Sequence, residues 1–322
     1  MDVHASPAEL PELQDFLGAF QGRFRRPEGA DALERYVTGL LSELPTKNGD
    51  PMAQAVPGTR EQRRQEFLTN MPWAAADLNR QRVEKMMAEV TLGDGVWVLD
   101  DTGVPTQGKT AVGGARQYSG TLGKVGTGPL AVTCGDTELQ AMGPVAVRLS
   151  LPHAWAEDLE RRGTARVPEE VTFQTNPEMA VARLDQARAW GVPHRCVVAD
   201  AGSGAPPHVL ATLDARQARD VLGVCTDCRV SDQRQATSPG HRVDQRLQAL
   251  PRWPWRTSRG RQGSQGWLRK KFVAVRCWRV TREGQRSVGW RLGERATRGQ
   301  PEEWQDYWRH RSASATVDEW AG

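Results

Sequence analysis

The chain has 322 residues, of which 38% are hydrophobic and 25% are charged, and its formal net charge is +4. A globular chain of this length has room for two domains, and the absence of any run near the ~18 apolar residues of a membrane span excludes a membrane protein. An odd number of Cys, five, and an N-terminal segment without a leader pattern exclude a secreted disulfide framework, so we expect a cytoplasmic protein.

The first part of the chain, residues 1–92, is predicted to form a helical domain. Apolar residues recur at helical spacing up to Pro45, and the Pro/Gly-rich segment 49–58 predicts a break between helices. Two further helices are expected at 60–68 and 75–90.

Three basic residues of this domain form a candidate DNA-binding patch. Arg60, Arg63 and Arg64 lie together in one predicted helix, and a small helical bundle that carries them could enter a DNA groove. A helical cap on the next domain is an equally good interpretation.

Residues 93–228 change from helical to alternating patterns. The predicted elements are strand 96–101, strand 129–134, strand 143–151, helix 177–190, strand 194–200, helix 206–219 and strand 220–225. Three consecutive strands followed by β–α–β alternation give a mixed sheet flanked by helices. This is the element order of the RNase H-like α/β fold, in which the ends of the first and fourth strands lie side by side.

Two of these strands end in acids. Asp100 and Asp101 follow the apolar run of the first, and Asp200 ends the strand at 194–200, 99 residues after Asp101. Buried carboxylates are costly to desolvate unless a cation or hydrogen bonds receive them. Two strands that each bring an Asp to one edge of a sheet therefore predict a site for a hard metal ion.

A phosphate-loop pattern, Gly-x(4)-Gly-Lys-Thr, occupies residues 103–110, so a nucleotide hydrolase is an alternative. Against it, residues 111–126 are Gly-rich without a helical period and offer no helix N-terminus to phosphates. Pro105 also lacks the backbone N–H that such a loop uses, and Asp100 and Asp101 would place negative charge beside the nucleotide.

Residues 229–322 are predicted to form a basic, β-rich insertion with strands at 272–280 and 287–292. Between Arg229 and Arg311 there are 20 Lys and Arg against 7 Asp and Glu. Such a balance indicates a polyanionic partner such as nucleic acid, with a solvated Arg-rich surface as the alternative. The candidates for phosphate contact outside the helical domain are Arg116, Lys124, Arg269, Lys270 and Lys271.

Cysteine and histidine give weaker signals. Cys225 and Cys228 have the spacing of half a zinc site, but no second pair lies nearby in the sequence, and we interpret Cys225 as a core residue. His153 and His194 flank strands and are interpreted as structural.

A series of motifs occurs in order along the chain. They are Asp100-Asp101-Thr102-Gly103, 112–120 with Gly123-Lys124, Leu151-Pro152 with Trp155 and Asp158, 167–171, Pro177-Glu178 and 199–204. Through them the chain resembles the bacterial DDE transposases of the insertion sequence 701 type, from about Lys47 to the C-terminus.

The resemblance implies an RNase H-like catalytic core whose acids hold two divalent ions, Mg²⁺ or Mn²⁺. The resemblance makes Asp101 and Asp200 the first two catalytic acids and metal ligands; Asp101 is the acid directly before Thr102. Because side chains alternate along a strand, Asp100 points to the other face. The implied reaction is metal-dependent cleavage at insertion-sequence ends and strand transfer. Double-stranded DNA is the implied partner and the nucleoid the implied location; the sequence leaves a homodimer open.

The sequence also departs from the family. The family's third acid, a Glu, lies on a helix after the β insertion in the pattern Arg-x(3)-Glu-x(6)-Lys, and the chain ends at Gly322 before such a pattern. The late acids that do not fit it are Glu294, Glu302, Glu303 and Glu319. We therefore expect DNA binding with little or no cleavage, and a non-catalytic DNA-binding remnant is the alternative to an active enzyme. Asn176 also stands where the family usually has Lys, and Ser203 where it has an aromatic residue.

Overall fold

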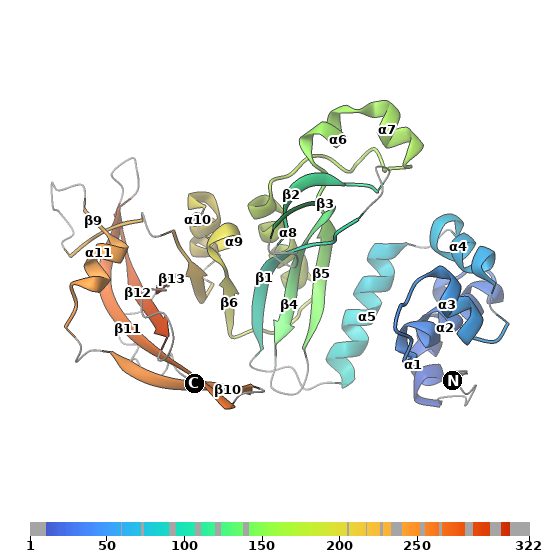
Figure 1. The fold of residues 1–322 in the computed structure, drawn as a ribbon, viewed down its shortest axis with the longest axis horizontal. Coiled ribbons are helices and arrows are strands. Elements are labelled where there is room, and N and C mark those ends of the chain that lie inside the picture. The colour runs from blue at the N-terminus through green and yellow to red at the C-terminus, as the bar shows by residue number, and fades with distance from the viewer. Residues whose placement is uncertain are drawn as a thin grey trace. The chain divides into compact units, whose positions relative to one another are not determined.

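The computed structural model of the chain divides into two compact units, residues 1–89 and 90–322 (Figure 1). The described residues are 11–58, 60–71, 74–89, 95–106, 111–119, 124–137, 142–204, 206–216, 218–225, 228–232, 240–251, 255–263, 266–280, 286–296 and 304–309. No helix among them is both long and apolar enough to cross a membrane.

The described part of the first unit is helical. Its elements are α1 (Pro11–Gly18), the 3-10 helix η1 (Gln21–Arg23), α2 (Pro27–Leu41), α3 (Gly49–Ala55), α4 (Glu61–Asn70) and α5 (Ala75–Glu89). The predicted break at 49–58 is wrong, because α3 occupies most of it. Pro51 lies in the first turn of α3, where its missing N–H leaves no helical hydrogen bond unmade, and Met52 and Ala55 are buried.

Phe67 of α4 lies at the centre of this unit's packing. Its side chain is buried, and its ring centroid lies 6.2 Å from that of Phe24 and 6.1 Å from that of Tyr36 in α2. Gly39 lets α2 approach α3, since a Cβ there would lie 2.7 Å from Met52 Cε. The helical unit therefore has a small core of its own.

The second unit is built on a mixed sheet of eleven strands. Their order is β5, β4, β1, β6, β7, β13, β12, β11, β8, β9, with β10 paired to β11. The strands are β1 (Val96–Gly103), β4 (Leu130–Thr137), β5 (Met142–Leu149), β6 (Cys196–Ala199), β7 (Asp220–Gly223), β8 (Arg229–Ser231), β9 (His241–Arg242), β10 (Arg256–Gly263), β11 (Gly266–Val280), β12 (Arg286–Ala296) and β13 (Trp304–Arg309).

The second unit also has helices, some of which pack on this sheet, and this confirms the predicted α/β class with a mixed sheet flanked by helices. They are α6 (His153–Glu157), α7 (Leu159–Thr164), α8 (Asn176–Ala189), α9 (Ala201–Gly204), α10 (Pro207–Ala215) and α11 (Val243–Gln248). α8 packs against β4, β5 and β1, and α10 packs against α8. The core between them contains the buried side chains of Trp97, Leu99, Val132 and Leu184.

The sequence-based prediction lacks the hairpin β2–β3 and the strands β8, β9, β10 and β13. A separate hairpin of β2 (Ala115–Ser119) and β3 (Lys124–Gly128) occupies the Gly-rich stretch after β1. β13 lies between the core and the basic segment, where Trp308 pairs with Leu222 of β7 on one side and with Arg291 of β12 on the other. One continuous sheet therefore includes strands from both 93–228 and 229–322, which the sequence analysis treats as separate segments.

Candidate active site

Strand β1 carries the first two acids of the candidate site. Trp97 and Leu99 are buried, and the strand then leaves the core, so that Asp100 and Asp101 are exposed. Because side chains alternate along a strand, Asp101 shares the face of Leu99 and Asp100 points to the opposite face.

Strand β6 brings Asp200 to the same edge. β1 and β6 are parallel, with Leu99 beside Ala199, so both strands reach their carboxyl ends together. Asp200 follows β6 directly and precedes the short helix α9. Two segments far apart in the sequence are thus neighbours in the middle of the core sheet (Figure 1).

Gly223 of the next strand, β7, permits this geometry. A Cβ at residue 223 would lie 2.6 Å from the backbone nitrogen of Ala201 and 2.8 Å from the carbonyl carbon of Asp200. Both contacts are with backbone, which cannot rotate away. Glycine at this position therefore lets β7 pass close under the turn that carries Asp200.

The acids interact electrostatically. Partial desolvation raises the pKa of Asp101 above its ordinary value, and the negative charges of Asp200 and then Asp100 raise it further. A hydrogen bond from Asn176 acts in the opposite direction and lowers this pKa. The site thus gathers negative charge that a cation would stabilise.

Asn176 is a site residue that sequence reasoning noticed only as a departure from the family pattern. Its Nδ2 donates a hydrogen bond of 3.1 Å to Asp101 Oδ2. The residue sits in the first turn of α8, where a capping box fixes the helix start: Thr175 N donates to Glu178 Oε2 at 2.8 Å, and Glu178 N donates to Thr175 Oγ1. The Thr-x-x-Glu spacing was a readable signal for this helix start.

The carboxylates of the candidate site meet some of the requirements of a hard divalent ion. Asp101 and Asp200 offer carboxylate oxygens, the ligands that Mg²⁺ prefers, and Mg²⁺ commonly keeps several waters beside one or two carboxylates. Within the described residues, no group of three or more His, Cys, Asp or Glu side chains could hold a metal ion. Asp101 and Asp200 are therefore the two carboxylates of the described residues that are candidates to hold a metal ion here.

The late acid Glu294 is engaged elsewhere. Its carboxylate on β12 is buried and accepts hydrogen bonds from Lys270 Nζ on β11 and, at 3.0 Å, from Tyr307 Oη on β13. This carboxylate therefore ties three neighbouring strands of the basic segment together.

The predicted DNA-binding residues of the helical unit lie in different environments. Arg60 precedes α4 and is exposed, as is Arg63. Arg64 is buried and donates from Nη1 to the Asn48 carbonyl at 3.3 Å. Arg64 thus joins α4 to the start of α3, a structural contact that its sequence position did not indicate.

The predicted phosphate contacts of the second unit are also distributed. Arg116 on β2 and Lys124 on β3 are exposed on the hairpin. On β11 the cluster 269–271 divides between the two faces of the sheet, since Lys270 points toward Glu294 while Arg269 and Lys271 share the other face. Only part of this cluster can therefore contact one DNA surface.

The remaining sequence signals have these outcomes. Cys225 is exposed, so its assignment to the core is wrong; it lies beyond the end of β7. His194 stacks on Trp97 with ring centroids 3.7 Å apart, and burial lowers its pKa. His153 lies 3.2 Å from Glu157 on α6 and packs edge-on against Phe173.

The phosphate-loop interpretation finds no support. The N–H groups of Val104 and Thr106 donate to the carbonyls of Pro129 and Thr127, both at 2.9 Å, so they extend the pairing of β1 and do not face a phosphate. The element that follows is strand β2, which offers no helix N-terminus. Residues 107–110 of the pattern lie outside the described residues.

Comparison with known proteins gives two findings. Residues 16–297 match the family model described as DDE superfamily endonuclease. Over 188 residues the chain is also 25% identical to a protein of Microchaete diplosiphon named probable transposase for insertion sequence element IS701. That alignment covers 58% of this chain and 47% of the relative, so the chain spans about half the length of the curated relative it matches.

Proposed function

The chain belongs to the DDE superfamily of endonucleases, and we propose that it acts as a transposase whose Asp101 and Asp200 serve in cutting DNA at insertion-sequence ends. The observation that carries the proposal is the pairing of β1 with β6, which sets two carboxylates of interacting charge at adjacent strand ends. The similarity to the protein of Microchaete diplosiphon supports DNA ends as the substrate.

In this proposal Asp101 and Asp200 hold divalent metal, Mg²⁺ or Mn²⁺. Such ions, two in an intact site, supply Lewis acidity that favours attack on a phosphodiester and stabilises the leaving oxygen. Asn176 holds the Asp101 carboxylate through its 3.1 Å hydrogen bond. Arg116, Lys124 and Lys271 are the candidates for contact with the DNA phosphates. Arg116 and Lys124 are exposed on the β2–β3 hairpin, and Lys271 lies on the face of β11 opposite to Lys270.

The test is nicking of a supercoiled plasmid that carries the DNA flanking the coding sequence. The wild-type chain should nick it in Mg²⁺ or Mn²⁺ and not in EDTA, whereas Asp101→Asn and Asp200→Asn should abolish nicking. Asp100→Asn is the matched control, since it removes the same charge one residue earlier, on the opposite face, and should keep most of the activity. Equal loss in all three variants would contradict the assignment of Asp101.

A second candidate function is DNA binding without cleavage. It is favoured by the number of acids, because the described residues bring no third metal-ligating group to Asp101 and Asp200. Thermal unfolding separates the candidates independently of cleavage. A ligand that binds only the folded chain stabilises it, so Mg²⁺ should raise the melting temperature of the wild type but not of Asp101→Asn if the site takes metal. DNA binding without nicking and without this stabilisation would favour the non-catalytic candidate.

A further inference from the structure

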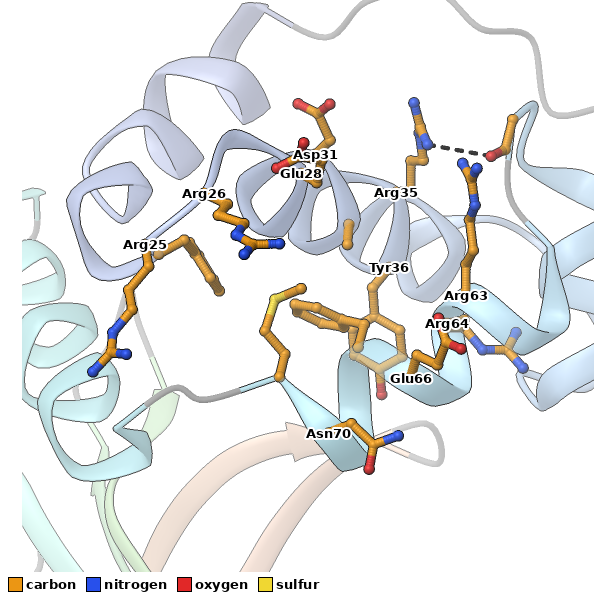
Figure 2. A pocket seen from close by; sticks show the side chains of 15 residues that line it. Arg25, Arg26, Glu28, Asp31, Arg35, Tyr36, Arg63, Arg64, Glu66 and Asn70 are labelled. Atoms are coloured by element: carbon orange, nitrogen blue, oxygen red, sulfur yellow. Dashed lines mark hydrogen bonds between the residues drawn. The ribbon is translucent and has the colours of Figure 1, made fainter.

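The helical unit contains a cavity of about 830 Å³ between α2 and α4 (Figure 2). Its volume lies within the range of about 300–1,000 Å³ that is typical of small-molecule sites. It lies entirely within residues 24–71, in the unit that does not carry Asp101 and Asp200.

The floor of the cavity is aromatic and apolar. Phe24, Tyr36, Phe67 and Met71 line it, and the buried ring of Phe67 supports those of Phe24 and Tyr36. Gly29 of α2 makes room for this floor, since a Cβ there would lie 2.8 Å from Phe24 Cδ1 and 2.9 Å from Met71 Sδ. The rings of Phe24 and Tyr36 are tilted by 40° and 50° from that of Phe67. A flat ligand can stack on one of them, because aromatic groups stack with an offset.

Arginine side chains lie at both ends of the aromatic floor. Figure 2 shows Arg26 at one end of the cavity and Arg35 and Arg63 together at the other, with the floor between them. Arg35 is held there by a 3.2 Å hydrogen bond from its Nη1 to the Gly58 carbonyl. Two cationic ends separated by an aromatic floor match a nucleotide in a chain, which has a base in the middle and a phosphate on either side.

Acidic and amide residues are also part of the cavity lining, and their side chains suit a base. They are Glu28, Asp31, Glu66 and Asn70. Carboxylates accept hydrogen bonds from the amino groups of cytosine, adenine and guanine, and an Asn amide can accept from N6 of adenine and donate to its N7. These acids would repel a ligand that was only an anion, which favours a base over free phosphate.

We propose that this cavity binds an unstacked base of single-stranded DNA, with the flanking phosphates at Arg26 and at Arg35 and Arg63. The inference rests on the proposed function only in taking DNA as the partner. Base stacking on aromatic side chains tolerates any sequence, so the cavity selects single-stranded over double-stranded DNA first, and the polar side chains that line it add a preference among the bases. It would hold a strand that has opened near a transposon end.

The experiment uses the full chain in EDTA and a trinucleotide, thymidine–2-aminopurine–thymidine, whose fluorescence falls when the base stacks on Tyr36. We expect saturable quenching by the wild type. Arg63→Ala should weaken binding at least about fivefold, and Ala32→Phe, which fills the cavity from α2 without changing its charge, should abolish quenching. Arg80→Ala is the matched control: Arg80 is exposed on α5 of the same unit but does not line the cavity, and the affinity of this variant for the probe should stay within about twofold.

The outcomes separate this inference from the proposed function. Asp101→Asn should bind the probe like the wild type, so quenching that persists in a chain without nicking activity would leave the cavity assignment standing. Equal weakening by Arg80→Ala and Arg63→Ala, or unchanged quenching in a folded Ala32→Phe variant, would overturn it. Displacement of the probe by an acidic peptide as readily as by deoxyadenosine monophosphate would also overturn it, since the cavity would then recognise charge alone.

Discussion

The Nδ2 of Asn176 donates a hydrogen bond of 3.1 Å to Oδ2 of Asp101, and thereby joins the first turn of α8 to the end of β1. The two residues are 75 positions apart in the chain. This bond opposes the effects of desolvation, Asp200 and Asp100 on the pKa of Asp101. Asn176 is therefore a positioning residue that also favours the ionised form of the carboxylate, the form that the proposed metal ion would need.

Removal of this hydrogen bond should raise the pKa of Asp101 further. Asn176→Ala loses the donor, so Asp101 should stay protonated to higher pH, whereas Asn176→Gln keeps an amide and should restore part of the difference. The measurement is an NMR titration of the Asp carboxyl carbons, with the Asp101 signal assigned from Asp101→Asn. An Asp101 titration midpoint that does not move in Asn176→Ala would show that the bond has no electrostatic role.

Ionised Asp101 should cost the fold stability at neutral pH. Its pKa in the folded chain lies above the unfolded value, so its stabilising contribution is present in full below the unfolded pKa and is lost as the pH rises through the folded pKa. Asp101→Asn should therefore be more stable than the wild type at pH 7, by less than about 1 kcal/mol because exposed charges are screened. Urea unfolding should show this difference at pH 7 and lose it as the pH falls below about 4, the ordinary pKa of an Asp side chain.

The acids of the site were predictable from the sequence because their signals are local. An apolar run that ends in Asp marks both β1 and β6, and the order of the elements places the two strands side by side. Asn176 was not predictable as a contact, since its reach to Asp101 depends on where α8 starts relative to a strand 75 residues away. The β2–β3 hairpin and β13 were missed because Gly-rich and Trp/Arg-rich segments hide the alternation that marks a half-buried strand.

Gly223→Ala should displace the turn that carries Asp200. The new methyl group would lie 2.6 Å from Ala201 N, and backbone on both sides must shift, which we expect to cost about 1–3 kcal/mol of unfolding free energy. Gly135→Ala on β4 is the matched control, because its Cβ meets only the Gly143 carbonyl oxygen at 3.7 Å. Urea unfolding and plasmid nicking of both variants measure the effect. Equal stability of the two variants would contradict the close approach at Gly223.

Arg162 on α7 should hold the segment that leads into α8. Its guanidinium donates to the carbonyls of Ala156, Pro168, Glu169 and Val171 at 2.9–3.3 Å. Arg162→Ala should lower the free energy of unfolding by about 1–3 kcal/mol, because these hydrogen bonds come from a charged donor. Arg162→Lys should recover only part of this lost stability, since a single ammonium group cannot reproduce the forked hydrogen bonds of the guanidinium. Hydrogen exchange of residues 165–175 should quicken in Arg162→Ala; unchanged exchange would assign this segment's order to other contacts.

Lys270 and Lys271 are adjacent on β11 and should have separate roles. Lys270 donates to Glu294, whose side chain is only 10% exposed, so Lys270→Ala leaves a poorly solvated carboxylate with the Tyr307 hydroxyl and should destabilise the fold by about 1–3 kcal/mol. Lys271 lies on the other face, in register with Arg295, whose guanidinium lies 4.5 Å from the centre of the Trp255 ring.

A phosphate contact by Lys271 would release one counterion, so Lys271→Ala should weaken binding to duplex DNA and lower the slope of log affinity against log salt by about one. Fluorescence anisotropy over a salt series and urea unfolding of both variants give the two measurements. Lys270→Ala, measured where it is fully folded, should keep the wild-type salt slope. The two substitutions remove the same charge one residue apart, on opposite faces of the strand. Equal salt slopes in both variants would therefore contradict the assignment of DNA binding to the face that carries Lys271.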